Sequence, residues 1–149
     1  MREKIAEALK EAQKTQDKRS ISTLRLILAA IKDRDIAHRG SGKDPVTSEE
    51  VLEILAKMVK QRQESAKAFE EGNRLELAEQ ERAEIEIIRT FLPQQLCEDD
   101  VKAACAEVID ETGADGLRDM GKCMSALKQK YPGQMDFGKA SGIVKGLLQ

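Results

Sequence analysis

The stretch Glu-Ile-Glu-Ile-Ile-Arg-Thr-Phe-Leu-Pro-Gln-Gln-Leu, residues 84–96, divides the chain into two patterns. An apolar helical stripe runs into this stretch and ends at Pro93, because proline lacks an amide hydrogen and moves the preceding residue out of helical geometry. A new pattern with a different charge balance begins after it. The sequence therefore predicts an all-α protein in which an N-terminal helical bundle, residues 1–92, is joined by a short hinge to a C-terminal three-helix module, residues 93–149.

The composition of the 149-residue chain excludes several classes of protein. Hydrophobic residues make up 40% of it and aromatic residues only 3%, which indicates an aliphatic core and argues against a base-stacking platform. No apolar run approaches the roughly 18 residues that span a bilayer, and the N-terminus is charged, so we expect a cytoplasmic protein with no membrane partner. The three cysteines lack Cys-x-x-Cys spacing, which implies neither a disulfide framework nor a zinc site.

Apolar periodicity predicts four helices before the hinge. Ser20 is predicted to cap the second helix, and Thr47 the third, where Glu50 completes a capping box. The glycine-rich, charged segment 38–45 is predicted to be a mobile loop; it lacks the spacing of a phosphate loop. The helices are expected over about residues 2–15, 20–37, 48–71 and 74–92.

Two charged residues interrupt the apolar stripes of the third and fourth helices. Arg62 and Glu81 lie at similar distances from Gly72, where the chain is expected to turn, so we predict that they form an internal ion pair that fixes the register of the hairpin. The alternative is that Glu81, Glu84 and Glu86 are catalytic or metal-binding carboxylates. No histidine lies nearby, and the three do not share one face of the helix, so we favour the ion pair.

Three shorter helices are predicted after the hinge. The first begins near Cys97, with acidic residues in its opening turn, and ends at Gly113. Asp119 begins the second, which closes at Pro132, and Asp136 caps the third.

Glycines recur every four residues in the last predicted helix, at Gly138, Gly142 and Gly146. Each glycine lowers helix stability by about 1 kcal/mol relative to alanine in a helix interior, so we considered two explanations for their regular spacing. One interpretation is close packing of this edge against a neighbouring helix. The other is that the backbone of a partner approaches the edge between Lys139 and Lys145.

The inventory for catalysis is poor. His38 is the only histidine, and all three cysteines lie in the other module. We therefore predict no catalytic, cofactor-binding or metal-binding residues.

The distribution of charge along the chain is more informative. Residues 1–45 carry 11 Lys/Arg against 7 Asp/Glu, residues 116–149 carry 6 against 2, and the middle of the chain carries 8 against 18. Two basic ends suit a polyanion, although solvated faces explain them equally well.

Five stretches of the sequence carry a family resemblance: STLRLILAAIK (22–32), KQRQES (60–65), EIEII (84–88), FLPQQL (91–96) and DMGK (119–122). Together they resemble the YqeY-like family, which shares its domain with the tail of one component of the aspartyl/glutamyl-tRNA amidotransferase. The resemblance covers nearly the whole chain. Two departures are Cys97, which stands where a capping Ser or Thr is usual, and Gly138, which adds flexibility near the start of the last helix.

The resemblance implies a helical protein whose C-terminal module is similar to the tail that grips the elbow of tRNA. Our first hypothesis is therefore a stand-alone module that binds tRNA or other structured RNA through exposed basic residues and the glycine edge. Arg118 and Lys122 are expected one turn apart on one side of a helix. The residues predicted to contact nucleic acid are Arg118, Lys122, Lys139, Gly142, Lys145 and Gly146.

Two alternatives come from other functional classes. Descriptions of the family imply carbon-nitrogen ligation with glutamine as the amide donor, so the second hypothesis is an amidotransferase-related component that needs a separate catalytic subunit. The third hypothesis is a helical adaptor that binds only proteins, which fits the acidic middle of the chain. Binding of tRNA across a salt series separates these classes.

Overall fold

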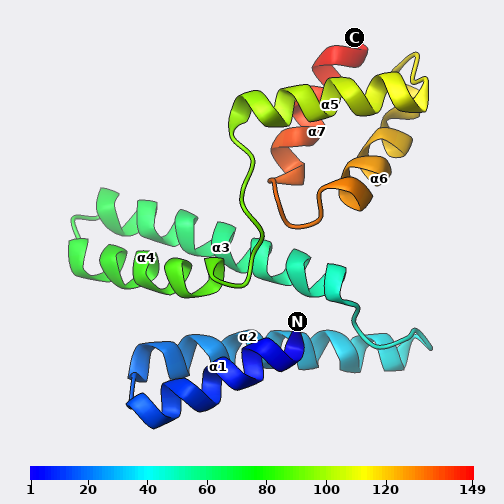
Figure 1. Ribbon diagram of the computed structural model, residues 1–149. Coiled ribbons are helices and arrows are strands. Elements are labelled where there is room, and N and C mark those ends of the chain that lie inside the picture. Colours follow the sequence, from blue (N-terminus) through cyan, green and yellow to red (C-terminus); the bar gives the residue numbers. More distant parts are fainter. The chain divides into compact units, whose positions relative to one another are not determined.

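The computed structural model describes all 149 residues and contains seven α-helices, one short 3-10 helix and no strand, which confirms the all-α prediction (Figure 1). The chain divides into two compact units, Met1–Leu92 and Pro93–Gln149. None of the helices is both long and apolar enough to cross a membrane. The first unit contains α1 (Arg2–Thr15), α2 (Lys18–Gly40), α3 (Ser48–Glu71) and α4 (Leu75–Arg89). The second contains α5 (Glu98–Thr112), the 3-10 helix η1 (Leu117–Asp119), α6 (Met120–Lys130) and α7 (Phe137–Leu148).

Helix α2 is central to the first unit, because it packs against α1, α3 and α4 (Figure 1). Its inward face carries Leu24, Ile27 and Ile31, which are all buried. Leu26 is apolar but lies outside this stripe: its side chain is 48% exposed because it projects from the outward side of the helix. The buried hydrophobic cluster of the unit is aliphatic apart from one methionine, and its members are Ile5, Ala12, Leu24, Ile27, Ile31, Val46, Val51, Ile54, Leu55, Met58, Val59, Ile85 and Ile88.

Side chains cap two helices of the first unit, α2 and α3, and the cap of α2 is shifted from its predicted position. Asp17, not Ser20, caps α2: its carboxylate accepts a hydrogen bond from the Ser20 amide at 3.2 Å and another from the Ser20 hydroxyl at 2.6 Å. The helix therefore begins earlier than predicted. At α3 the capping box is confirmed, because the Glu50 amide donates to Thr47 Oγ1 at 3.2 Å and the Thr47 amide donates to Glu50 Oε2 at 2.8 Å.

Residues 38–40 of the segment predicted to be a mobile loop belong to α2, and the connection that follows is tied to α1 and α2. Arg2 donates two hydrogen bonds to Asp35, at 2.5 and 2.7 Å, and a third to the Val46 carbonyl at 3.0 Å. The Val46 amide in turn donates to Asp35 at 2.9 Å. His38 Nδ1 lies 2.9 Å from the Asp44 carbonyl oxygen. The start of α1, the end of α2 and the connection are thus joined through one carboxylate.

This arrangement predicts a pH-dependent contribution to stability. The Arg2 guanidinium and the Val46 amide lower the pKa of Asp35 from its ordinary value of 3.8 to about 2. Because the pKa is lower in the folded state, the contribution is present above pH 4 and is lost as the pH falls from about 4 to about 2. We expect Asp35→Asn to unfold at lower denaturant concentration than the wild type at pH 6, with the difference vanishing near pH 2. An equal difference at both pH values would contradict this role of Asp35.

A second prediction concerns Thr23, which is completely buried in the core and whose hydroxyl has no hydrogen-bond partner. An unpaired buried hydroxyl has lost its water without compensation, whereas valine has a similar shape and no polar atom. We expect Thr23→Val to raise the free energy of unfolding by about 1 kcal/mol. Thr23→Ser, which keeps the hydroxyl and removes the methyl group, should lower it. A loss of stability in the valine variant, measured by chemical denaturation, would show that the hydroxyl is needed.

In the second unit α5, α6 and α7 all pack against one another. The segment that enters the unit is fixed to the turn before α7, because the Leu96 amide donates to the Gln134 carbonyl at 2.9 Å. Cys97 occupies the N-cap of α5 without a capping side-chain bond, and Gly113 ends the helix at φ 64° as predicted. The buried core consists of Val101, Ala104, Cys105, Val108, Cys123, Leu127, Met135, Ala140 and Val144.

Candidate nucleic-acid interface

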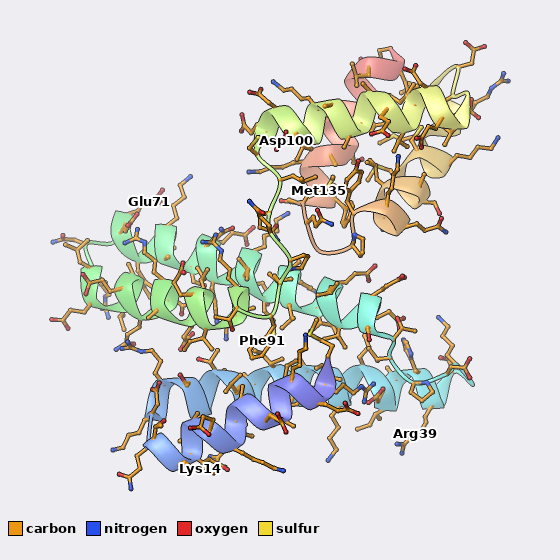
Figure 2. All side chains as sticks on the ribbon, viewed as in Figure 1. Lys14, Arg39, Glu71, Phe91, Asp100 and Met135 are labelled. Atoms are coloured by element: carbon orange, nitrogen blue, oxygen red, sulfur yellow. The ribbon has the colours of Figure 1, made fainter.

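The charges of the second unit are separated by helix. Helix α5 holds three acidic residues in its first turn, where the positive end of the helix dipole favours them; Asp100, labelled in Figure 2, is one of these. Helices α6 and α7 carry five lysines and no acidic residue between their first and last positions. The two helices that pack against each other on one side of the unit therefore form its basic part.

Four of the predicted cationic residues, Arg118, Lys122, Lys139 and Lys145, are exposed, and none of them forms an ion pair. Lys130 behaves differently, because its ammonium group donates to Glu107 at 2.8 Å and to Glu111 at 2.9 Å. These carboxylates raise the pKa of Lys130, which keeps it protonated, and their negative charges balance its positive charge. The unpaired cations remain available to an anionic partner.

Arg118 lies in η1 and not in α6 itself. The sequence argument placed it beside Lys122 by assuming that both belong to one α-helix, in which residues four apart are neighbours. A 3-10 helix has three residues per turn, so the spacing alone does not bring the two side chains together. Asp119, the predicted cap, accepts a hydrogen bond from the Asp115 amide at 3.1 Å instead of bonding to α6.

The glycine edge of α7 is open. Gly142 and Gly146 are exposed, and a Cβ atom built on either would meet no atom within 4 Å. The interpretation that these glycines permit close packing against a neighbouring helix of this chain is therefore wrong. Lys139 and Lys145 each lie three residues from Gly142, so both are its neighbours on the helix surface and flank it on opposite sides.

One basic residue that the sequence argument did not select also belongs to this region. Lys128 of α6 is exposed, and its ammonium nitrogen lies 6.0 Å from the centre of the Phe137 ring at the start of α7. This contact is at the outer limit of a cation-π interaction and joins the two basic helices. Lys128 and Phe137 belong to different helices, and no local sequence pattern predicts their contact.

The internal ion pair has a different partner from the one predicted. Arg62 Nε donates to Glu84 Oε2 at 3.0 Å, not to Glu81. The expected turn was centred on Gly72, but Gly72 has φ −82°, and Asn73 takes the left-handed conformation at φ 59°. Arg62 and Glu84 are equally far along the chain from Asn73, so the true turn aligns them.

Glu81 is nevertheless coupled to this pair. Burial raises its pKa above the ordinary value of 4.5, the charge of Glu84 raises it further, and the charge of Arg62 opposes both effects. The three side chains thus form one partly buried charged cluster between α3 and α4. Through the bond from Arg62 to Glu84, the cluster links α3 to α4.

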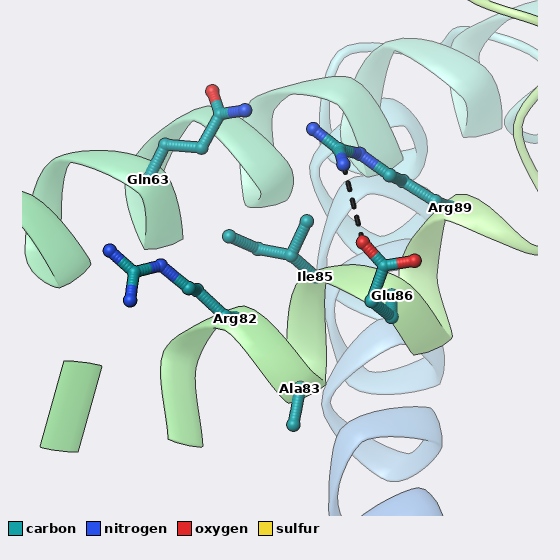
Figure 3. A pocket seen from close by; sticks show the side chains of 6 residues that line it. All are labelled: Gln63, Arg82, Ala83, Ile85, Glu86 and Arg89. Carbon is teal, nitrogen blue, oxygen red and sulfur yellow. Dashed lines mark hydrogen bonds and ion pairs between the residues drawn. The ribbon is translucent and has the colours of Figure 1, made fainter. Parts of the chain in front are cut away.

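A pocket of about 380 Å³ opens beside this cluster, between α3 and α4 (Figure 3). It contains none of the residues predicted to contact nucleic acid. Its two arginines are already paired within the chain, Arg82 with Glu70 and Arg89 with Glu86, the latter at 3.3 Å. The pocket is lined by Gln63, Arg82, Ala83, Ile85, Glu86 and Arg89.

The single histidine is engaged in the structure of the first unit. His38 Nε2 lies 3.5 Å from Glu50, while its other ring nitrogen contacts the backbone of the connection after α2. The buried thiol of Cys105 has a raised pKa because burial disfavours the thiolate, which makes it a poor nucleophile. No three His, Cys, Asp or Glu side chains are grouped so that they could hold a metal ion.

Comparison with known proteins gives one family and several relatives. A family model described as "Yqey-like protein" matches residues 2–148. "Uncharacterized protein C22F3.15" of Schizosaccharomyces pombe is 33% identical over 91 residues, which cover 60% of this chain and 70% of that protein. "Altered inheritance of mitochondria protein 41, mitochondrial" of Lachancea thermotolerans is 34% identical over 86 residues, which cover 58% of this chain and 44% of that protein.

A protein with the same name from Clavispora lusitaniae is 28% identical over 143 residues, 94% of this chain and 80% of its own length. These names assign the two relatives to mitochondria, and the cytoplasmic location of the present protein stays a prediction. The family match extends across both units and nearly every residue. The chain therefore belongs to the YqeY-like protein family.

Proposed function

We propose that this protein is a binding module for structured RNA such as tRNA, and that an RNA backbone lies along the exposed edge of α7. The observation that carries the proposal is the exposed glycine edge at Gly142: a Cβ there would meet no atom within 4 Å, and the flanking Lys139 and Lys145 are exposed and form no ion pair. The resemblance to the tRNA-gripping tail of the amidotransferase supports tRNA as the class of RNA.

The chemistry of this edge suits a phosphate backbone. Lysine ammonium groups are point charges that bind phosphate oxygens, and glycines without Cβ atoms let a backbone approach the helix closely. The aromatic residues of the second unit, Tyr131 and Phe137, are both partly buried, so neither presents a fully exposed ring for stacking. Recognition should therefore depend on shape and charge, with little preference for base sequence.

Filter binding of total tRNA tests this function directly. We expect the full-length protein to bind tRNA at low salt, with an affinity that falls steeply as salt rises. Unstructured poly(U) of equal length serves as the control and should bind more weakly at every salt concentration, because it does not present a folded backbone. Equal affinity for both would contradict recognition of RNA shape, and no binding at low salt would exclude the proposed function.

The variant Gly142→Ala tests whether the glycine at this position is needed for RNA binding. A Cβ at this position meets nothing in the chain, so the variant should be more stable by about 0.5–1 kcal/mol, the usual gain of alanine over glycine in a helix interior. If RNA lies against this edge, the same methyl group should weaken tRNA binding. Thermal melting and filter binding measure the two effects. A variant that is more stable and binds tRNA unchanged would remove Gly142 from the interface.

A further inference from the structure

The outward side of α2 carries a regular pattern that the fold does not use. Seam positions alternate at intervals of four and three residues, and cations beside them recur every seven residues. We call the first set the outward seam: Ser22, Leu26, Ala29, Asp33, Ile36 and Gly40. We call the second set the cation ladder: Lys18, Arg25, Lys32 and Arg39. Arg39, labelled in Figure 2, marks the C-terminal end of the ladder.

Every residue of the seam and the ladder is exposed. The side chains of Leu26 and Ile36 are 48% and 55% exposed, which makes them two of the large apolar residues that the fold leaves in solvent. A residue of this size gains by burial, so the seam has apolar surface to offer a partner.

None of the ladder cations forms an ion pair. Other arginines packed on or against the same helix have carboxylate partners: Arg34 lies 3.8 Å from Glu53, and Arg2 is bonded to Asp35. The ladder is therefore a row of cations without ion-pair partners along the helix, of which only Arg39 is shown to act on a carboxylate of the chain, lowering the pKa of Asp35. At about 1.5 Å per residue its members repeat about every 10.5 Å.

The outward seam and the cation ladder together form the pattern of a helix that pairs with another helix. In a coiled coil, residues at intervals of four and three form the contact seam, and charged residues next to the seam select the partner. Small residues such as Ser22 and Ala29 allow a second helix to approach closely. A carboxylate repeated every seven residues on that helix has the same period of about 10.5 Å as the ladder, so all four cations can be paired at once.

We infer that the outward face of α2 binds an amphipathic helix of a partner protein, with apolar side chains over Leu26 and Ile36 and carboxylates along the edge that meets the cation ladder. Asp33 lies within the seam and requires a polar or cationic residue opposite it, which fixes the register of the partner. This surface lies in the first unit and acts independently of RNA binding by α7.

Two other occupants fit less well. RNA would satisfy the ladder, but it would leave the apolar side chains of Leu26 and Ile36 beside polar phosphates and sugars. A second copy of α2 would bring four cations and one carboxylate against an identical set, so it provides almost no complementary charge. An acidic amphipathic helix satisfies both the seam and the ladder.

The probe is a synthetic three-heptad helical peptide with leucine at its seam positions and glutamate on both flanking edges, which keep it monomeric by mutual repulsion at neutral pH. We expect the full-length protein to bind the labelled peptide in fluorescence anisotropy. Arg25→Glu with Lys32→Glu should weaken this binding about tenfold or more, because two attractive contacts become repulsive. The same peptide with glutamine in place of glutamate should bind the wild type about as weakly.

The matched control is Lys4→Glu with Lys10→Glu, which reverses two exposed cations on α1 outside the ladder. It should leave peptide binding within about twofold of the wild type, and all proteins should melt alike because every changed residue is exposed. Equal losses from the control and ladder variants would show general electrostatic attraction and overturn the inference. So would failure of the wild type to bind the peptide, or tRNA binding that is lost with the ladder while peptide binding is retained.

Discussion

Arg62→Met is expected to lower the free energy of unfolding of the first unit by about 2–3 kcal/mol. Arg62 and Glu84 are mostly buried, with side chains 13% and 26% exposed, and they are joined by a 3.0 Å hydrogen bond. Removal of the guanidinium leaves Glu84 partly desolvated beside Glu81, whose pKa is already raised by burial and by the charge of Glu84. Methionine fills the space of the arginine stem, so the loss reports on charge rather than on packing.

Chemical denaturation of a double-mutant cycle measures this interaction. Arg62→Met combined with Glu84→Leu should recover more than half of the loss, since no uncompensated partner remains. The control is Arg89→Met, which removes the exposed pair with Glu86 and should cost less than about 0.5 kcal/mol. Additive losses in the cycle would show that Arg62 and Glu84 do not interact.

The pH dependence of the Arg62→Met variant gives a further check. A carboxyl group with a raised pKa in the folded state stabilises the protein below its ordinary pKa and loses that effect as the pH rises. Without Arg62, the pKa of Glu81 loses the one charge that opposes its rise. The penalty of the substitution should therefore be larger at pH 7 than near pH 4.

Replacing Lys122, Lys139 and Lys145 together by glutamine should have the largest effect on function. Each ammonium group that contacts a phosphate releases a counterion, so each lost contact should flatten the slope of log affinity against log salt by up to about one unit. Near 0.1 M salt this corresponds to a loss of roughly tenfold per contact. Because all three side chains are exposed and unpaired, the melting temperature should change by only a few degrees.

The matched control for this variant replaces three exposed lysines outside α6 and α7, namely Lys4 and Lys10 of α1 and Lys102 of α5. Both variants lose the same net charge, so a general electrostatic effect would weaken tRNA binding equally in the two. We expect the control to keep most of its affinity and nearly the wild-type salt slope. An unchanged slope in the Lys122, Lys139 and Lys145 variant would exclude these residues as phosphate contacts.

Local rules predicted the parts of the fold that depend on neighbouring residues. The Thr47/Glu50 capping box is formed by side chains three positions apart, and Asp136 caps α7 by accepting a hydrogen bond from the Gly138 amide at 2.9 Å. Both signals are complete within a few residues of sequence. The same holds for Gly113, which is needed where α5 ends in a left-handed conformation.

Features that depend on tertiary geometry were less predictable. The partner of Arg62 changed because Asn73 adopts the left-handed conformation in the turn, and this moves the alignment of α3 and α4. Leu26 is apolar yet exposed: α2 has apolar residues on most of its sides, and only packing decides which of them are covered. The exposure of the glycine edge of α7 could not be predicted either, because glycines at this spacing suit close packing and open exposure equally well.

The most direct test of the central claim is an NMR titration of the full-length protein with tRNA. If an RNA backbone lies along the edge of α7, the backbone amide signals of Gly142 and Gly146, together with those of Lys139 and Lys145, should shift or broaden at the lowest tRNA concentrations. The signals of buried residues in the first unit, such as Ile27, should remain in place. Perturbations confined to the first unit, with the α7 signals unchanged at saturation, would contradict the account.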